Sequence, residues 1–264
     1  MPSLRVAVSG SGNMGDHVLA AITATGDMAV VGVLDGLAEA DHCTLPDGSE
    51  VPLLRSLDDL DVLKADVVVD FTNAVWTEAL LPTAIASGIR PVVGTSGLAT
   101  PFVEEMVAAS AEAGVGGVIA SNFALGAVMM MHLARVAAPH FESVEVIEQH
   151  HDGKVDAPSG TAMTTAEEMR KARGSDFRRN VADRETLPNA RAAEFGGVTL
   201  HSVRLPGLVA HQEVIFGGTG ETLKLRHDSI NRESFMPGVV RAVRESGGLD
   251  RIVVGLDRLL GLID

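Results

Sequence analysis

The stretch LRVAVSGSGNMG, from Leu4 to Gly15, decides the fold of the first half of the chain. Its first six residues form a Val-rich apolar run typical of a buried strand, and the run stops at the pattern Gly10-x-Gly12-x-x-Gly15. From Met14 the apolar residues recur at helical spacing. In dinucleotide sites such glycines let the backbone approach a pyrophosphate, whose charge faces the N-terminus of the following helix. The stretch predicts a strand, a turn and a helix that bind a dinucleotide; the alternative is a plain turn without a ligand.

The rest of the first half repeats this strand and helix unit. A second apolar run ends at Asp35, where an acidic side chain would accept hydrogen bonds from the ribose hydroxyls of adenosine. Further strands are expected over 66–71, 90–94 and 115–120, and helices over 74–87 and 101–113, with Thr100 as N-cap of the latter. Buried strands separated by helices indicate an α/β fold, a doubly wound parallel-sheet (Rossmann-like) dinucleotide-binding domain over residues 1–122. Residues 38–56 are expected to be a surface excursion rather than a core element.

The pattern changes in the second half. Helices are expected over 125–139 and 159–173, strands over 143–149, 199–205, 210–217 and 221–227, and an exposed stretch over 174–194. The last three strands alternate apolar and polar residues, which is typical of antiparallel strands with one wet face. We therefore expect a mixed α+β substrate-binding and oligomerisation domain over residues 123–230. Residues 231–264 are expected to return to the dinucleotide-binding domain.

Composition excludes several functional classes. The 264 residues hold 21 Lys and Arg against 35 Asp and Glu, a formal charge of −14 that disfavours nucleic acid and anionic membranes as partners. The single cysteine, Cys43, allows no intrachain disulfide and no cysteine-based metal site, so we expect no metal. With no signal peptide and no apolar run near membrane-spanning length, the sequence indicates a cytoplasmic protein.

Polar turns follow three of the predicted strands at the sheet edge where open α/β sheets bind ligands. Either they are simple strand-to-helix turns or they line a cleft for nicotinamide and substrate. Together with the glycine turn and Asp35, the second interpretation gives the candidate cofactor-binding residues, which are Gly10, Ser11, Gly12, Asn13, Met14, Gly15, Asp35, Phe71, Gly94, Thr95, Ser96, Ser121, Asn122 and Phe123.

The segment EQHHDGKVDAPSGTA, residues 148–162, holds the densest chemistry. His150 and His151 supply acid or base groups near neutral pH, and Lys154 supplies a cation and a proton donor. The start of the next helix, Ser159 to Thr161, offers backbone N–H groups to a carboxylate. A solvated loop is the alternative, and a metal site is disfavoured because no third ligand lies at a suitable spacing.

This segment resembles the signature loop of the 4-hydroxy-tetrahydrodipicolinate reductase (dihydrodipicolinate reductase) family. Asp70-Phe71-Thr72, Gly94-Thr95-Ser96-Gly97, Asn122-Phe123 and His227-x-x-x-x-Arg232-x-x-Phe235-x-x-Gly238 resemble the family in the same order, so the likeness covers essentially the whole chain.

The resemblance implies NAD(P)H-dependent reduction of 4-hydroxy-tetrahydrodipicolinate to tetrahydrodipicolinate with loss of water, in the diaminopimelate route to lysine. It also implies that His150 is the acid/base group, that Lys154 is a proton donor, and that His151, Gly160 and Thr161 contact a dicarboxylate substrate. Ser159, from the same helix start, joins these substrate contacts in our prediction. The family further implies a cytoplasmic homotetramer.

The sequence departs from the family pattern at three places. Ser9 and Asn13 replace a glycine and a basic residue in the phosphate loop, and Ser121 replaces a proline. Gly36 stands where relatives that use NADPH carry arginine. Because Asp35 would repel a 2′-phosphate and Gly36 offers no cation, we expect NADH to be preferred, with NADPH possible and favoured by a Gly36→Arg substitution.

Two other functional classes remain open at this point. One is another two-domain NAD-dependent dehydrogenase that acts on an imine or an oxo acid. The other is a non-catalytic dinucleotide sensor, which would bind the nucleotide without turnover.

Overall fold

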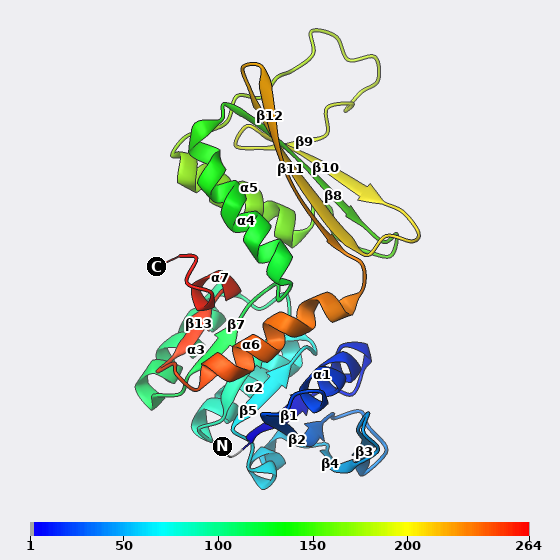
Figure 1. Cartoon of the computed structure of the whole chain (residues 1–264), viewed down its shortest axis with the longest axis vertical. Coiled ribbons are helices and arrows are strands. Elements are labelled where there is room, and N and C mark those ends of the chain that lie inside the picture. The colour runs from blue at the N-terminus through cyan, green and yellow to red at the C-terminus, as the bar shows by residue number, and fades with distance from the viewer. Residues whose placement is uncertain (1–2, 264) are drawn as a thin grey trace. The chain divides into compact units, whose positions relative to one another are not determined.

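The computed structural model describes residues 3–263 and divides into two compact units (Figure 1). Unit 1 holds the chain up to Phe123 and again from Phe235 onward, and unit 2 runs from Ala124 to Ser234. The divisions thus follow Phe123 and Ser234, where the sequence placed them after Asn122 and Ile230. No helix within residues 3–263 is both long and apolar enough to cross a membrane.

Unit 1 is built on an eight-stranded sheet with the order β13-β7-β6-β5-β1-β2-β4-β3. All neighbouring strands are parallel except β3 and β4, which are antiparallel. Between β1 and β5 the strand order reverses, which is where open sheets of this kind bind ligands. The strands are β1 (Leu4–Ser9), β2 (Met28–Leu34), β3 (His42–Thr44), β4 (Glu50–Leu54), β5 (Val67–Asp70), β6 (Arg90–Val93), β7 (Gly117–Ile119) and β13 (Ile252–Val254).

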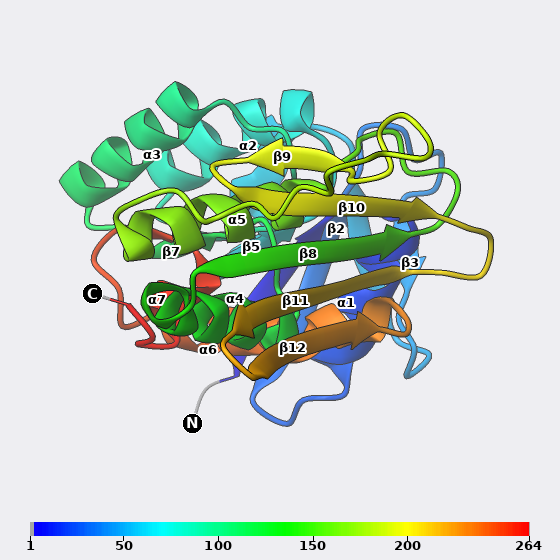
Figure 2. The ribbon, with the colours of Figure 1, turned by 90° about the horizontal axis from the view of Figure 1, so that it is seen from above.

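Helices cover both faces of this sheet. Helices α1 and α6 pack together on one face, and α2 and α3 pack together on the other (Figure 2). The central strands are consequently buried on both sides, as their continuous apolar sequences predict. The helical elements are α1 (Asn13–Thr23), η1 (Leu57–Leu63), α2 (Ala74–Ala86), α3 (Thr100–Ala113), α6 (Met236–Ser246) and α7 (Leu256–Leu259), with η3 (Arg232–Phe235) at the division between the units.

Two sequence predictions for unit 1 are wrong. Residues 38–56 are not a mere surface excursion, because they contain β3 and β4, and β4 extends the sheet beside β2. Pro52 occupies the exposed position between buried Val51 and Leu53, and a proline within so short a run disfavours a strand prediction, which obscured β4. Helix α3 is capped by Ala99 rather than Thr100, which is already its first residue.

Unit 2 has two layers, a five-stranded mixed sheet and helices on one of its faces. Their shared core includes Val144, Val146, Met169, Val214 and Phe216, each side chain contributing about 1.5–3 kcal/mol on burial. The strand order is β12-β11-β8-β10-β9. The elements are α4 (Leu125–Ala137), η2 (Ala138–His140), β8 (Ser143–His150), α5 (Gly160–Arg173), β9 (Ala193–Phe195), β10 (Val198–Arg204), β11 (Ala210–Gly218) and β12 (Glu221–Ser229).

The predicted strand pairing in unit 2 needs one correction. Strands β11 and β12 are antiparallel neighbours, but β10 does not pair with β11. Strand β8 lies between them and pairs with β10 in parallel and with β11 in antiparallel orientation. Alternation along a strand determines which side chains are buried, and it leaves the identity of the neighbouring strand open.

Candidate active site

The glycine turn leaves room for a phosphate at the N-terminus of α1. Gly10 has φ +92°, and a Cβ on Gly15 would lie 2.1 Å from the Gly10 carbonyl oxygen, so the turn needs glycine at both positions. Gly12 is the N-cap residue of α1, where no side chain caps the helix, and a Cβ there would meet no atom within 4 Å. Of the other predicted residues in this turn, Asn13 is exposed and Met14 is half-buried in the first turn of α1. This open space beside uncapped N–H groups suits a pyrophosphate.

Asp35 lies at the end of β2 and faces the same turn. Its Oδ2 accepts from Ser11 N at 2.9 Å and from Ser11 Oγ at 2.5 Å, and its Oδ1 accepts from Leu37 N at 2.9 Å. Burial by itself would raise the pKa of Asp35, but these hydrogen bonds outweigh it and hold the pKa below its usual value. The carboxylate is therefore ionised at neutral pH, as an acceptor for ribose hydroxyls must be.

The ring of Trp76 leaves little space for a side chain at Gly36, directly after Asp35. A Cβ on Gly36 would lie 2.9 Å from the ring of Trp76, whose Nε1 donates to Ser9 Oγ at 2.8 Å. Substituting arginine at Gly36 would therefore push this ring aside, so the Gly36→Arg test proposed from the sequence is unsuitable. Leu37 is 94% exposed and has no such restriction.

Arg55 brings a cation to this loop from a distant part of the sequence. Its Nε donates to the carbonyl of Ala38 at 2.7 Å, and its Nη2 contacts Asp41 Oδ1 at 2.9 Å and the carbonyl oxygens of Glu39 and Ala40. The sequence has no Arg or Lys between Arg5 and Arg55. In the structure the Arg55 guanidinium lies at this loop, where residues 38–41 accept its hydrogen bonds.

The predicted residues at the ends of β5 and β6 lie together. The Phe71 ring packs edge-on against Phe123, with centroids 5.3 Å apart, and covers Gly94, where a Cβ would lie 2.0 Å from it. Phe123 is 1% exposed, so its ring supports Phe71 from below, whereas Ser96 and Ser121 are exposed and Asn122 is half-buried.

Asp70 is a functional candidate that the sequence prediction omitted from its site residues. It is fully buried at the end of β5 and accepts hydrogen bonds from three threonine hydroxyls, Thr72 at 2.8 Å, Thr77 at 2.5 Å and Thr95 at 2.9 Å. It thus ties together the loops after β5 and β6. The signal available in the sequence was an acidic residue at the end of the apolar run Val67–Val69.

In unit 2, Glu148 organises the predicted acid/base residue. Glu148 is fully buried on β8, and its Oε2 lies 2.5 Å from His150 Nδ1. His150 is the last residue of β8 rather than part of the following loop, so the strand orients its backbone.

Arg204, at the end of β10, binds both oxygens of Glu148 at 2.9 and 2.8 Å. Its Nη groups also donate to the carbonyls of Val203 and Asp156. Each of the four Nη hydrogens of Arg204 therefore has an acceptor within the chain. Only the structure shows this arrangement, since the two residues lie 56 positions apart.

The electrostatics keep Glu148 charged and His150 neutral. Burial would raise the pKa of Glu148, but hydrogen bonds from Arg204, Ser202 and His150 lower it below its usual value. Burial is the main cause that lowers the pKa of His150; Glu148 raises it, and Lys154 and Arg204 lower it further. Since the ionised carboxylate can only accept, His150 carries a proton on Nδ1 and presents Nε2 as the exchangeable position.

Lys154 and the start of α5 both bind the carboxylate of Asp156. Lys154 Nζ lies 2.6 Å from Asp156 Oδ1, and hydrogen bonds from Lys154 and from the Gly160 backbone lower the pKa of Asp156. Gly160 is exposed with open space around its Cα, Thr161 is half-buried, and His151 is exposed.

Ser159, a predicted substrate contact, lies at the N-cap of α5. Its Oγ accepts from Ala162 N at 3.3 Å, and its N donates to Glu148 Oε1 at 3.2 Å. It is 2% exposed, and its side chain caps α5.

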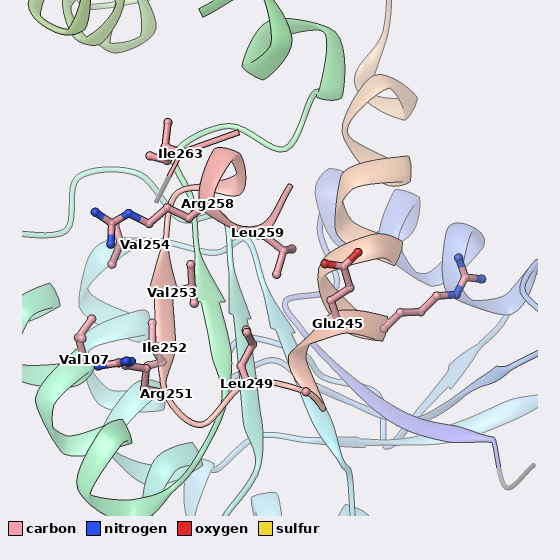
Figure 3. A pocket seen from close by; sticks show the side chains of 12 residues that line it. Val107, Glu245, Leu249, Arg251, Ile252, Val253, Val254, Arg258, Leu259 and Ile263 are labelled. Atoms are coloured by element: carbon pink, nitrogen blue, oxygen red, sulfur yellow. The ribbon is translucent and has the colours of Figure 1, made fainter. Parts of the chain in front are cut away.

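The predicted site residues lie outside the cavity of unit 1. A cavity of about 800 Å³ in unit 1 is lined by α6, β13 and α7, and it contains none of the predicted site residues (Figure 3). Two arginines on its wall are paired, Arg244 with Asp27 and Arg251 with Asp250. Residues 3–263 hold no group of three or more His, Cys, Asp or Glu side chains that could bind a metal.

Comparisons with known proteins cover the whole chain. Residues 4–123 match the family model described as dihydrodipicolinate reductase, N-terminus, and residues 126–260 match the model of its C-terminus. A 4-hydroxy-tetrahydrodipicolinate reductase of Dehalococcoides mccartyi (strain CBDB1) is 44% identical, with 99% of this chain and 100% of the relative covered. The corresponding protein of Halalkalibacterium halodurans is 42% identical over 97% of this chain and 99% of its own.

A solved structure agrees with these sequence matches. The dipicolinate-bound dihydrodipicolinate reductase from Paenisporosarcina sp. TG-14 superposes with a TM-score of 0.87 at 38% identity, covering 97% of this chain and 99% of that one. Fold, full-length identity and both family models agree, and the chain belongs to the dihydrodipicolinate reductase family.

Proposed function

We propose that this chain catalyses the NAD(P)H-dependent reduction of 4-hydroxy-tetrahydrodipicolinate to tetrahydrodipicolinate, with loss of water, in the diaminopimelate route to lysine. The proposal rests on the family membership together with one observation in unit 2, the buried Glu148 that orients His150 beside the Lys154 loop. Family membership argues against a different dehydrogenase, and the intact acid/base group argues against a sensor without turnover.

Unit 1 fits a pyridine nucleotide. The open space at Gly12 would take the pyrophosphate, with Ser11 and Asn13 beside it, and Asp35 would take the adenosine ribose. Phe71, Gly94, Thr95 and the exposed Ser96 would border the nicotinamide. The nucleotide, when bound, supplies the hydride.

The protons of the reaction are transferred by side chains of the protein, His150 and Lys154. Loss of water removes a ring proton and a hydroxyl group, and the reduction adds one hydride and one proton to the ring. His150 Nε2 is suited to accept or return a proton because its other nitrogen is held as a donor to Glu148. Lys154 is suited to donate one as negative charge develops on the ring.

Substrate binding is assigned to the groups around Asp156. Lys154 Nζ and the Gly160 N–H already hold one carboxylate, that of Asp156, and the same donors would hold a substrate carboxylate once Asp156 moves aside. Thr161 adds a hydroxyl, and the exposed imidazole of His151 adds a further donor. In the Paenisporosarcina relative the bound molecule is dipicolinate, itself a ring with two carboxylates.

The decisive experiment is a coupled assay. Aspartate semialdehyde, pyruvate and a dihydrodipicolinate synthase generate the substrate, and loss of NADH absorbance reports turnover. His150→Gln should lower kcat by roughly 10²- to 10⁴-fold with unchanged NADH affinity, because the proton-transfer group is removed. NADH affinity is measured separately through the fluorescence of Trp76, the only tryptophan, which lies beside Gly36. Lack of turnover by the wild-type chain would refute the proposal.

Lys154 is tested with pyridine-2,6-dicarboxylate as a competitive inhibitor. Lys154→Ala should weaken both inhibition and turnover, and inhibition of the wild type should weaken as salt rises. Lys224→Ala is the matched control, since Lys224 lies in the same unit, is 60% exposed and pairs with Glu213 rather than with a predicted site residue. Equal inhibition of all three proteins would remove Lys154 from the substrate site.

For the cofactor we propose a preference for NADH, with NADPH also accepted. Asp35 would repel a 2′-phosphate, and Arg55 is engaged by the loop over residues 38–41. Leu37→Arg should raise the NADPH-to-NADH ratio of kcat/KM about tenfold or more by adding a charged donor. Leu37→Gln controls for loss of the leucine. A wild-type ratio that already favours NADPH would contradict the preference.

We also propose a cytoplasmic homotetramer. The face of the unit 2 sheet opposite α4 and α5 carries Ile147 and Ile215, half-buried apolar side chains on neighbouring strands that a partner could cover. Light scattering should give four times the 27.6 kDa of one chain, and Ile215→Asp should yield smaller species. Cys43 is a free thiol, which suits the reducing cytoplasm.

A further inference from the structure

We propose that Glu148 and Arg204 are positioning residues that set the tautomer of His150 and couple it to the substrate loop. The inference rests on the proposed function, because it concerns how the acid/base group of that reaction is held. It assigns a task to a buried ion pair that lies outside the groups proposed above to bind cofactor and substrate.

Glu148 is saturated with hydrogen-bond donors. Its Oε1 accepts from Arg204 Nη2 at 2.8 Å and from Ser159 N at 3.2 Å. Its Oε2 accepts from His150 Nδ1 at 2.5 Å and from Arg204 Nη1 at 2.9 Å, and the Ser202 hydroxyl is a further donor. A carboxylate in the interior is costly unless it is paired, and Arg204 supplies that charge.

The consequence for His150 is a fixed direction of proton exchange. With Nδ1–H committed to Glu148, the neutral ring has its lone pair on Nε2, and the charged ring has its transferable proton there. Without the carboxylate the ring could adopt the opposite tautomer, which places the lone pair toward the protein interior.

The same pair also fixes the substrate loop. Arg204 Nη2 donates to the carbonyl of Asp156 at 2.6 Å, and Asp156 in turn holds Lys154. Ser159, which caps α5, donates its N–H to Glu148. The Glu148 carboxylate therefore connects the end of β8, the loop and the N-terminus of α5. The position of His150 and the positions of the groups around Asp156 depend on the same Glu148–Arg204 pair.

Glutamine at position 148 tests this arrangement because it keeps the shape and removes the charge. If its nitrogen replaces Oε1, it faces Arg204 Nη2 and Ser159 N, which are both donors. If its nitrogen replaces Oε2, it donates to His150 Nδ1 and imposes the opposite tautomer. Neither orientation satisfies all of the donors that Glu148 accepts.

We therefore expect Glu148→Gln to lower kcat on the order of 10²-fold while KM changes less and NADH binding, read from Trp76 fluorescence, stays within about twofold. The limb of the pH–kcat profile that reports His150 should move to lower pH. The carboxylate that raises the pKa of His150 is then gone, while Lys154 and Arg204, which lower it, remain.

A double-mutant cycle separates positioning from general damage. If the effect of Glu148 on kcat acts through His150, the kcat of the Glu148→Gln/His150→Gln protein should equal that of His150→Gln alone, and a loss through the substrate loop should appear in KM. Multiplying losses would overturn the inference, as would a Glu148→Gln enzyme with the kcat and pH profile of the wild type. If Glu148→Gln does not fold, Arg204→Lys provides the same cycle, because it keeps the charge and loses the two-pronged contact.

The matched control is Glu145→Gln, three residues earlier on β8, where a glutamate also contacts an arginine and a histidine. Its kcat and pH profile should equal those of the wild type, with the oligomeric state checked in parallel. A wild-type chain without reductase activity would refute the proposed function, whereas an active wild type with an unaffected Glu148→Gln variant would refute only this inference.

Discussion

Strand β8 carries two clusters of the same composition on its two faces. On one face Glu148 contacts Arg204 and His150, and on the other Glu145 contacts Arg191 at 2.5 Å and His201 at 2.8 Å. The distances are similar, yet the side chain of Glu148 is 0% exposed and that of Glu145 is 36% exposed.

Because of this difference in burial, the partners of Glu148 should contribute more to stability than the partners of Glu145. In a single chain, water around Glu145 screens its partners and replaces them when they are removed, so the pair contributes little to the stability of that chain. No water replaces the partners of Glu148, and α5 closes its side of the sheet through Ser159. The chemistry of a glutamate, an arginine and a histidine is therefore decided by the face on which they lie.

The largest expected effect concerns removal of the arginine from each cluster. Arg204→Met leaves Glu148 as an uncompensated buried charge and should lower the free energy of unfolding by about 3–5 kcal/mol. Arg191→Met should cost about 0–1 kcal/mol, because water takes its place. Urea unfolding of the two variants and the wild type measures both values. Equal losses would show that the two clusters do not differ in this way.

A smaller effect is expected in the pH dependence of stability. The pKa of His150 is lowered in the folded chain, so the unfolded chain binds a proton first as the pH falls below the usual value of about 6.5. The free energy of unfolding should therefore decrease as the pH falls from about 7.5 to 5.5, and that of the His150→Gln variant should decrease less over the same range. Chemical unfolding at several pH values tests this, and identical slopes for the two proteins would contradict it.

The smallest effect is the coupling within the outer cluster. A cycle of Glu145→Gln and Arg191→Met should give a coupling energy of about 0.2–1 kcal/mol at low ionic strength, and about 1 M salt should largely abolish it. The same cycle on Glu148 and Arg204 should persist in salt, because the buried pair is little screened. A salt-insensitive outer pair would mean that Glu145 is more shielded than its exposure indicates.

Local features of the sequence were sufficient for much of the fold. The apolar run to Ser9, the three glycines and the helical spacing after them determine the β1, turn and α1 unit, because strand burial and tight turns depend on neighbouring residues. The position of His150 near Lys154 and the start of α5 also followed from the sequence, since these groups lie within one short segment.

Partners from distant parts of the chain were decided only by the tertiary structure. Arg55 binds the loop over residues 38–41, Trp76 packs on Gly36, and β8 separates β10 from β11. Strand alternation specifies buried faces, but the pairing of strands depends on packing of the whole sheet.

Glu148 shows most clearly what could not be predicted from the sequence. The sequence by itself determined that a glutamate on a predicted strand precedes His150 by two positions, but that predicted strand ended at Gln149 and left the direction of the His150 side chain open. Only the tertiary structure brought Arg204 to that carboxylate and enclosed both beneath α5. The physical reason is that charge, tautomer and pKa depend on burial and on partners in space, and neither is a property of local sequence.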